Sequence, residues 1–234
     1  MKAVLLAAGL GTRLRPITNE VPKCMVPVNG MPIIERQIRN LVDNKINEIY
    51  VVAGYKENVL KTFIREKYPF VRVIENKEYA TTNNMFSLYK TVEYVRGDEF
   101  LLMNSDVFHD ATVEAGLISS DKSNMIACEY GRYLDESMKI SVDNGLITHI
   151  GKQISKEEAY ATSIDIYKIG RDAGNILFDI CEEIIVKEGN CNSWTEVALD
   201  KMFSKVDFYP YGIEGRWFEI DNHDDLADAE KLFK

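Results

Sequence analysis

The stretch that decides the fold is KAVLLAAGLGTRLRPITNEVPK, which runs from Lys2 to Lys23. Residues Lys2–Ala8 show almost no polar alternation, which is typical of a central strand of a parallel sheet that is covered on both faces. Gly9 and Gly11 follow at once, and glycines in this place let the backbone turn sharply and bring N–H groups close to a ligand. The sequence therefore predicts a buried strand that leads into a phosphate-binding loop.

Predicted strands and helices alternate through the first half of the chain. The further strands are expected at Glu48–Gly54, Val71–Glu75 and Glu99–Asn104, and the helices at Pro32–Asn44, Glu57–Lys67 and Asn84–Val95. Strand–helix–strand repetition implies right-handed crossovers. We therefore expect an α/β fold with a Rossmann-like, mainly parallel central sheet and helices on both of its faces.

The second half contains more predicted strands. They lie at Asn124–Glu129, Ser137–Val142, Leu146–Ile150, Ser163–Tyr167, Val206–Tyr211 and Trp217–Ile220, with a hairpin turn at Asp143-Asn144-Gly145. Helices are expected at Ala173–Lys187, Thr195–Ser204 and Asp224–Phe233. Because no repeat or low-complexity linker interrupts the pattern, we expect one domain over residues 1–234. Residues 1–110 would form its first half and residues 111–234 its second half.

Charge and hydropathy exclude several classes of protein. The formal net charge is −9, which disfavours a nucleic-acid partner, because phosphate backbones require clustered Lys and Arg. No apolar run is long enough for a membrane span, so no membrane insertion is expected. The four cysteines show no CxxC spacing, and without a secretory signal we expect reduced thiols in the cytoplasm. The sequence leaves the oligomeric state open, with a homodimer among the alternatives.

Two cations follow the predicted loop. Arg13 and Lys23 are placed to neutralise a triphosphate, and in open parallel sheets ligands bind at the carboxyl ends of the strands, where this loop falls. The stretch is not a Walker loop, because no GK[ST] follows. It is not the dinucleotide fingerprint either, because Leu14 stands at the position of the third glycine. Spacing alone favours an ordinary turn with Arg13 and Lys23 as solvated surface charges.

The stretch Leu6–Ile34 resembles the signature of the sugar-phosphate nucleotidyltransferase superfamily, because GxGTR, Pro16, Pro22-Lys23 and Pro32 stand in that order. The resemblance implies nucleotidyl transfer, with Lys23 stabilising charge on the attacked α-phosphate and Arg13 holding the leaving pyrophosphate. Such catalysis rests on positioning and electrostatics. The resemblance also implies nucleotide contacts from Leu6, Ala8, Gly9, Gly11, Thr12, Arg13 and Lys23.

The same resemblance implies a magnesium ion held by two carboxylates. Asp106 directly follows the strand that ends at Asn104, and Asp221 lies in the segment WFEIDN, which resembles the family's C-terminal metal segment. Paired carboxylates that hold Mg²⁺ between phosphates are a common arrangement for this ion. Either aspartate has the alternative role of a helix cap or turn residue.

The nucleotide base and the acceptor depend on the segment YATTNNMFSL, residues 79–88. Sugar-specific relatives tend to carry a glycine pair here, whereas this chain has Asn83 and Asn84. The segment resembles cytidylyltransferases that act on phosphocholine and, more loosely, on aminoethylphosphonate. It thus implies CTP as the nucleotide, with Thr81 and Asn83 on the nucleotide and Asn84 beside the acceptor. One of the two asparagines is equally suited to cap the next helix.

The acceptor is expected to be a small phosphorylated or phosphonate compound, such as phosphocholine, aminoethylphosphonate or a phosphorylated amino acid derivative. The resemblance assigns its phosphate to Lys152, with Lys139 as a second candidate, and Glu196 is a candidate contact for a nitrogen. A quaternary ammonium would instead favour an aromatic cage. Candidates for such a cage are Tyr130, Tyr133, Tyr160 and Trp194.

The predicted reaction joins CMP from CTP to this acceptor and releases pyrophosphate, and relatives of this kind serve cell-surface polysaccharide synthesis. One alternative is a sugar-1-phosphate nucleotidyltransferase that uses UTP, dTTP or GTP. A remote alternative is a non-catalytic nucleotide-binding regulator. The cations Arg13 and Lys23 and the carboxylates Asp106 and Asp221 disfavour it, because a binding module needs no pair of metal carboxylates.

Overall fold

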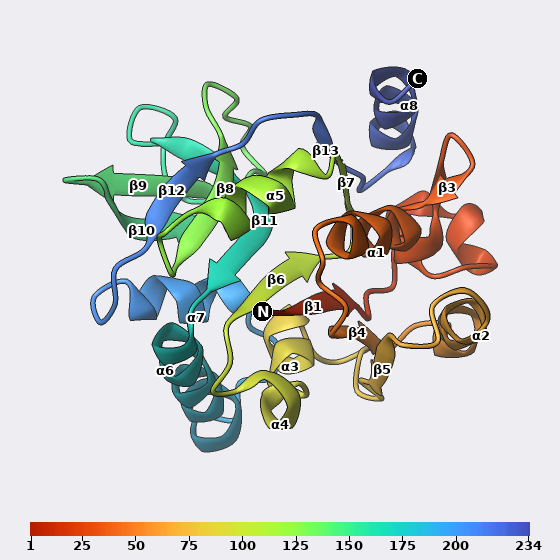
Figure 1. Cartoon of the computed structure of the whole chain (residues 1–234), viewed down its shortest axis with the longest axis horizontal. Helices are drawn as coiled ribbons and strands as arrows, with labels where there is room; N and C mark the ends of the chain where they lie inside the picture. The colour runs from red at the N-terminus through yellow and green to blue at the C-terminus, as the bar shows by residue number, and fades with distance from the viewer.

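The computed structural model describes all 234 residues, which build a nine-stranded central sheet of order β10-β9-β11-β6-β1-β4-β5, with β8 paired to β11 and β12 paired to β8 (Figure 1). Its first-half strands are β1 (Lys2–Ala7), β4 (Ile49–Ala53), β5 (Arg72–Glu75) and β6 (Phe100–Asn104). They pair in parallel, β1 with both β4 and β6, and β4 with β5. The expected mainly parallel α/β fold is confirmed.

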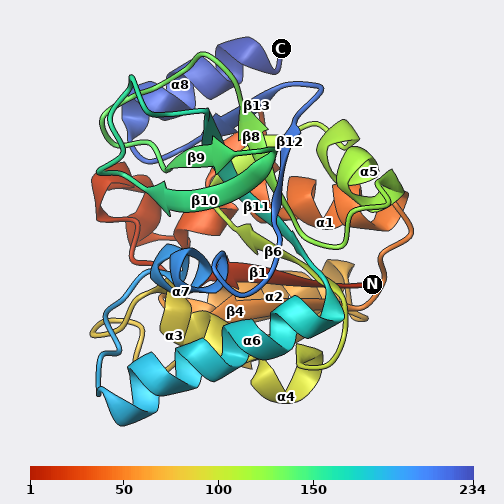
Figure 2. The ribbon, with the colours of Figure 1, turned by 90° about the vertical axis from the view of Figure 1, so that its left-hand side faces the viewer.

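The side chains of β1 point alternately to the two faces of the sheet, and each face has its own hydrophobic core. Val4 and Leu6 face one side, where they pack with residues of α3 (Asn84–Tyr89), α4 (Val92–Val95), α6 (Arg171–Glu182) and α7 (Thr195–Met202). Ala3, Leu5 and Ala7 face the other, with residues of α1 (Ile33–Asp43), α2 (Glu57–Lys67) and α5 (Thr112–Ser119). Figure 2 shows α3, α4 and α6 together below the sheet. A strand buried on both faces explains why β1 lacks polar alternation.

The second half extends this sheet with antiparallel strands. They are β8 (Met125–Glu129), β9 (Lys139–Asp143), β10 (Leu146–Gly151) and β11 (Ala161–Ile169), with β12 (Tyr209–Gly212) in parallel beside β8. β11 pairs antiparallel with β6, so one sheet crosses both halves of the chain. The predicted hairpin turn joins β9 to β10, and its residues Asn144 and Gly145 both have positive φ.

Two details of the secondary structure differ from expectation. The single helix predicted over 84–95 is wrong: it breaks between α3 and α4, where the hydroxyl of the buried Thr91 donates to the Leu88 carbonyl. Sequence patterns also missed short elements, namely the strands β2 (Pro27–Val28), β3 (Met31–Pro32) and β7 (Val107–His109), the helix α5, and the 3-10 turns at Thr12–Leu14, Ile17–Asn19 and Lys23–Met25. The last turn of α6 widens into a π-helix at Glu183–Lys187.

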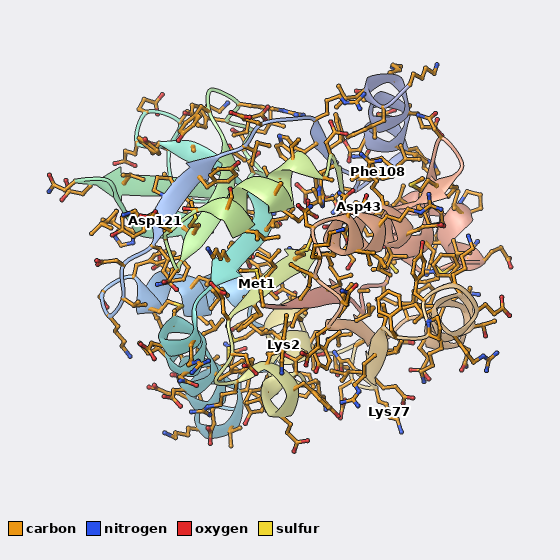
Figure 3. The ribbon with its side chains drawn as sticks, viewed as in Figure 1. Met1, Lys2, Asp43, Lys77, Phe108 and Asp121 are labelled. Carbon is orange, nitrogen blue, oxygen red and sulfur yellow. The ribbon has the colours of Figure 1, made fainter.

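A small second sheet brings the C-terminal segment to the edge of the main sheet. β13 (Trp217–Glu219) pairs antiparallel with β7, and the Ile220 amide donates to the Asp106 carbonyl at 2.9 Å. Phe108 of β7, labelled in Figure 3, lies near α8 (His223–Leu232). Its ring packs against that of Phe233 at the end of α8, with 4.8 Å between ring centroids. Residues more than a hundred positions apart therefore meet beside the carboxyl end of β6. None of the helices combines the length and apolarity that a membrane span requires.

Candidate active site

A cavity of about 610 Å³ opens at the carboxyl ends of β1 and β6. This size is typical of a small-molecule site, and its position follows the rule for open α/β sheets. Thirteen of the expected site residues line it: Leu6, Ala8, Gly9, Gly11, Thr12, Arg13, Lys23, Asn83, Asn84, Asp106, Lys152, Glu196 and Asp221.

The loop after β1 is held in a conformation that requires glycine at one position. Gly11 has φ of +59°, and a Cβ there would lie 2.9 Å from Cβ of Lys23. The Thr18 hydroxyl donates to the Gly11 carbonyl at 2.8 Å, which fixes the turn from outside. Close packing between Gly11 and Lys23 places the lysine directly behind the loop.

Cations and carboxylates that lie far apart in sequence meet on the cavity floor. Nζ of Lys23 lies 2.7 Å from Oδ2 of Asp106 and 2.6 Å from Oδ1 of Asp221. Nη2 of Arg13 lies 2.9 Å from Oδ2 of Asp221. Burial opposes the charge on Lys23, but Asp106 and Asp221 outweigh it and raise the pKa of Lys23. For Asp221 burial is likewise outweighed, first by Lys23 and then by Arg13, so its pKa is lowered.

A third carboxylate, which sequence reasoning missed, completes this group. Ligand atoms of Asp106, Glu219 and Asp221 all lie within 4.8 Å of one another. Although the Glu219 side chain is open to the cavity, partial burial of its carboxyl and then the charge of Asp106 raise its pKa to about 9. The segment WFEID contained a signal for Glu219, because it lies two residues before Asp221. Residues two apart in extended chain face the same side.

These carboxylates fit a divalent metal ion. Hard oxygen donors are the ligands that Mg²⁺ and Ca²⁺ prefer. Oδ1 of Asp106 is buried and has no hydrogen-bond partner, so it is free to accept a cation. The ammonium of Lys23 already bridges Asp106 and Asp221, which demonstrates that the pair accepts positive charge at this point.

The wall around α3 differs from expectation at one residue. Thr81 is exposed, does not line the cavity, and donates its hydroxyl to the Glu78 carbonyl, so its assignment to the nucleotide is corrected. Its neighbour Thr82 does line the cavity. Asn76, which sequence reasoning missed, lines the cavity and donates 3.0 Å to the Ser87 hydroxyl and 3.2 Å to that of Thr82. Asn76 directly follows β5, much as Asp106 lies just beyond the end of β6. This shared position after a parallel strand could have identified Asn76 from the sequence.

Asn83 and Asn84 have different structural roles, since only one of them caps the next helix. Oδ1 of Asn83 accepts from the Asn84 amide, so Asn83 caps α3. Oδ1 of Asn84 accepts from the Thr195 amide at 2.8 Å and so ties α3 to the start of α7. Both side chains still line the cavity.

The two candidate acceptor lysines occupy different environments. Lys152 lines the cavity, with Nζ 3.2 Å from Oε2 of Glu136 and 5.1 Å from the centroid of the Trp194 ring. Lys139 is corrected: it is buried, does not line the cavity, and donates to the carbonyls of Leu134, Asp135 and Ser137. Its ammonium satisfies the backbone of the β8–β9 loop, so its role is structural.

A family model described as Nucleotidyl transferase matches residues 2–137, more than half of the chain. This chain belongs to the nucleotidyl transferase family. Within the matched residues lie the loop, Arg13, Lys23 and Asp106.

Curated relatives and a solved structure extend the similarity. A 2-aminoethylphosphonate cytidylyltransferase of Lancefieldella rimae is 35% identical over 160 residues, 64% of this chain and 60% of that protein. A choline-phosphate cytidylyltransferase of Streptococcus pneumoniae is 44% identical over 110 residues, 44% of this chain and 47% of that protein. The structure of a CTP:phosphocholine cytidylyltransferase from Streptococcus pneumoniae superposes with a TM-score of 0.82 at 26% identity, over 100% of this chain and 99% of that chain. The chain spans about half the length of most curated relatives it matches.

At the far wall of the cavity, this nucleotidyltransferase carries two further carboxylates. The Tyr167 hydroxyl lies 3.0 Å from Oδ1 of Asp165 and 2.9 Å from Oε1 of Glu196. Burial, followed by the charge of Glu196, raises the pKa of Asp165 to about 7, and burial also raises the pKa of Glu196. Sequence reasoning identified Glu196 and missed Asp165.

The aromatic cage considered from the sequence is not assembled. Of its four candidates only Trp194 lines the cavity, while Tyr130 and Tyr160 pack edge to face outside it, with 5.5 Å between ring centroids. Trp217 and Phe218 also line the cavity, and the Arg132 guanidinium lies over both, at 5.7 Å and 5.2 Å from the ring centroids. Arg132 is a lining cation that the sequence did not reveal.

Proposed function

We propose that this nucleotidyltransferase transfers CMP from CTP to a small phosphorylated or phosphonate acceptor and releases pyrophosphate. The observation that carries the proposal is the meeting of Lys23 and Arg13 with Asp106 and Asp221 beside the glycine loop. Two relatives are cytidylyltransferases, and their acceptors contain a phosphate or a phosphonate group. These names support CTP and this class of acceptor.

The chemistry requires positioning and charge stabilisation. An oxygen of the acceptor phosphate attacks the α-phosphorus in line, the bond to the β-phosphate oxygen breaks, and pyrophosphate leaves with its electron pair. The triphosphate offers Lys23 and Arg13 phosphate oxygens in place of the carboxylates that they now contact. Lys23 then stabilises charge on the attacked phosphate and Arg13 on the leaving pyrophosphate, while Lys152 holds the acceptor phosphate.

We propose magnesium as the metal, held by Asp106, Glu219 and Asp221. When bound, it supplies neutralisation of the charge on the phosphate oxygens that it contacts. Asn76, Thr82 and Asn83 form the wall beside the loop, and their amides and hydroxyls offer donors and acceptors to a pyrimidine edge. We assign this wall to the base.

A nucleotide panel tests the proposal. Pyrophosphate release is measured with CTP, UTP, GTP and dTTP in turn, each with magnesium and a mixture of 2-aminoethyl phosphate, 2-aminoethylphosphonate and phosphocholine. A parallel set of reactions contains glucose 1-phosphate in place of this mixture. We expect kcat/KM for CTP to exceed that for each other nucleotide by at least tenfold. Equal or faster turnover of UTP, GTP or dTTP, or release only with a sugar 1-phosphate, would refute cytidylyl transfer.

A further inference from the structure

The far wall of the cavity holds two carboxylates that no side-chain cation offsets. Asp165 comes from β11 and Glu196 from the first turn of α7, and both line the cavity. Their hydrogen-bond partners are the neutral groups of Asn104, Ser163, Tyr167 and Asn84. The charge of a further carboxylate, Asp106, also acts on both. Buried charge without a counter-charge is costly, so such a pair favours a cation supplied from outside.

The lining cations are all engaged elsewhere. Arg13 and Lys23 pair with Asp221 and Asp106, on the metal side of the cavity. Lys152 pairs with Glu136 and lies over Trp194. Arg132 lies over Trp217 and Phe218, near Glu129. In this arrangement a substrate cation is the remaining partner for Asp165 and Glu196.

The backbone at Asp165 is strained in a way that directs its side chain. Asp165 has φ of +59°, a conformation that non-glycine residues adopt at a cost, and the pairing of β11 with β8 shifts register between Ser163 and Tyr167. Bulges of this kind re-aim a side chain and are common beside active sites. Nδ2 of Asn104 donates to Oδ2 of Asp165 at 2.9 Å and fixes the carboxylate in the cavity wall.

The two carboxylates share the cavity with the proposed metal site. Asn104, whose Nδ2 donates to Asp165, ends β6, and Asp106 lies in the turn two residues later. Asp106, Asp165 and Glu196 all line the same cavity. This arrangement fits a small acceptor with a short bridge between its phosphorus and its cation.

We propose that Asp165 and Glu196, oriented by the Tyr167 hydroxyl, bind the protonated primary or secondary amine of the acceptor. Each carboxylate oxygen has lone pairs that an N–H donor satisfies, and a quaternary ammonium has no N–H. A quaternary ammonium needs free aromatic faces. Here Lys152 lies over Trp194, and Arg132 lies over Trp217 and Phe218. The inference rests on the proposed function and narrows its acceptor to N–H amines.

The decisive experiment compares matched acceptors with the wild-type enzyme. Pyrophosphate release is measured with CTP and magnesium, using 2-aminoethyl phosphate, 2-aminoethylphosphonate, phosphocholine and propyl phosphate. We expect kcat/KM for one of the two amines to exceed that for phosphocholine and for propyl phosphate by at least tenfold. Turnover of phosphocholine or propyl phosphate as fast as the amines overturns the amine assignment and leaves cytidylyl transfer standing. No CTP turnover with any of the four overturns both proposals.

Two variants test the carboxylates themselves. In Asp165→Asn and Glu196→Gln we expect the amine-to-propyl-phosphate ratio of kcat/KM to fall at least tenfold, through a higher KM for the amine. The control is Asp179→Asn on the outer face of α6, whose side chain is 63% exposed and pairs with Arg96. An unchanged ratio in both folded variants overturns the inference. Thermal melts identify a variant that fails to fold, and the wild-type comparison then decides alone.

Discussion

Nζ of Lys23 lies 2.7 Å from Oδ2 of Asp106, although 83 residues separate them in sequence. Lys23 begins the short 3-10 turn that follows the glycine loop, and Asp106 follows β6. Because β1 and β6 are parallel neighbours, both segments emerge at the same edge of the sheet. The ion pair therefore places Lys23, the cation that we propose for the triphosphate, beside the carboxylates that we propose for the metal.

Removing the carboxylate of Asp106 tests its proposed role in catalysis. We expect Asp106→Ala to lower kcat by on the order of 10²–10³, the range seen when one group that stabilises transition-state charge is lost. Lys23 keeps Asp221 as a partner, so the protein should stay folded. Steady-state pyrophosphate release and a thermal melt measure the two effects. Activity within threefold of wild type would show that Asp106 has no part in catalysis.

Glu219 provides a separate test of the metal site. Glu219→Gln removes one of the three carboxylates within 4.8 Å of one another, so we expect the magnesium concentration for half-maximal activity to rise about tenfold or more. The matched control is Glu214→Gln on the preceding turn, which is exposed and does not line the cavity. A magnesium titration of both variants decides, and identical curves would remove Glu219 from the site.

Substitutions of Lys152 and Lys139 should affect different properties, acceptor binding and stability respectively. Lys152→Met is expected to raise the acceptor KM about tenfold, because its proposed contact with the acceptor phosphate is lost. The melting temperature should change little, because the ion pair of Lys152 with Glu136 is exposed. Lys139→Met is expected to cost about 2 kcal/mol of unfolding free energy, because it leaves three backbone carbonyls without their donor. Urea unfolding and acceptor titrations separate the two. A higher acceptor KM with unchanged stability in Lys139→Met would restore the assignment that the structure corrects.

A buried pair beneath α1 predicts how stability depends on pH. Burial lowers the pKa of His109 to about 4 and raises that of Glu114, whose Oε2 lies 3.5 Å from Nδ1 of His109. The folded state thus keeps a proton on Glu114 that the unfolded chain loses above about pH 4.5, so this contribution to stability declines as pH rises. His109 acts oppositely, since its contribution is full above pH 6.5 and is lost toward pH 4.

Glu114→Gln isolates the first of these effects. The amide of the variant cannot ionise. We therefore expect the melting temperature of the variant minus that of wild type to be larger at pH 8 than at pH 5.5. Melts of the variant, wild type and Glu214→Gln at both values provide the comparison. A difference between variant and wild type that stays constant over this range would mean that Glu114 is ionised in the folded protein.

How much the sequence predicts depends on how local the determining features are. Gly11, Lys23 and Asp106 stand in short motifs whose roles the resemblance to the nucleotidyltransferase signature implies, and the structure brings all three to one cavity. Asp165 could not be found this way, because its direction depends on a register shift and a positive φ that tertiary pairing imposes. Lys139 and Lys152 look alike in sequence. Only the folding of residues 134–137 back over Lys139 separates them.

In the proposed reaction one CMP unit passes from CTP to the phosphorus-bearing end of the acceptor. Phosphorus-31 NMR of a reaction containing enzyme, magnesium, CTP and 2-aminoethyl phosphate measures every phosphorus species at once. We expect a CDP-linked diphosphate and pyrophosphate to appear in equal amounts, at the rate at which CTP disappears. Pyrophosphate accompanied by free CMP, or CTP that persists unchanged, would contradict cytidylyl transfer to this acceptor.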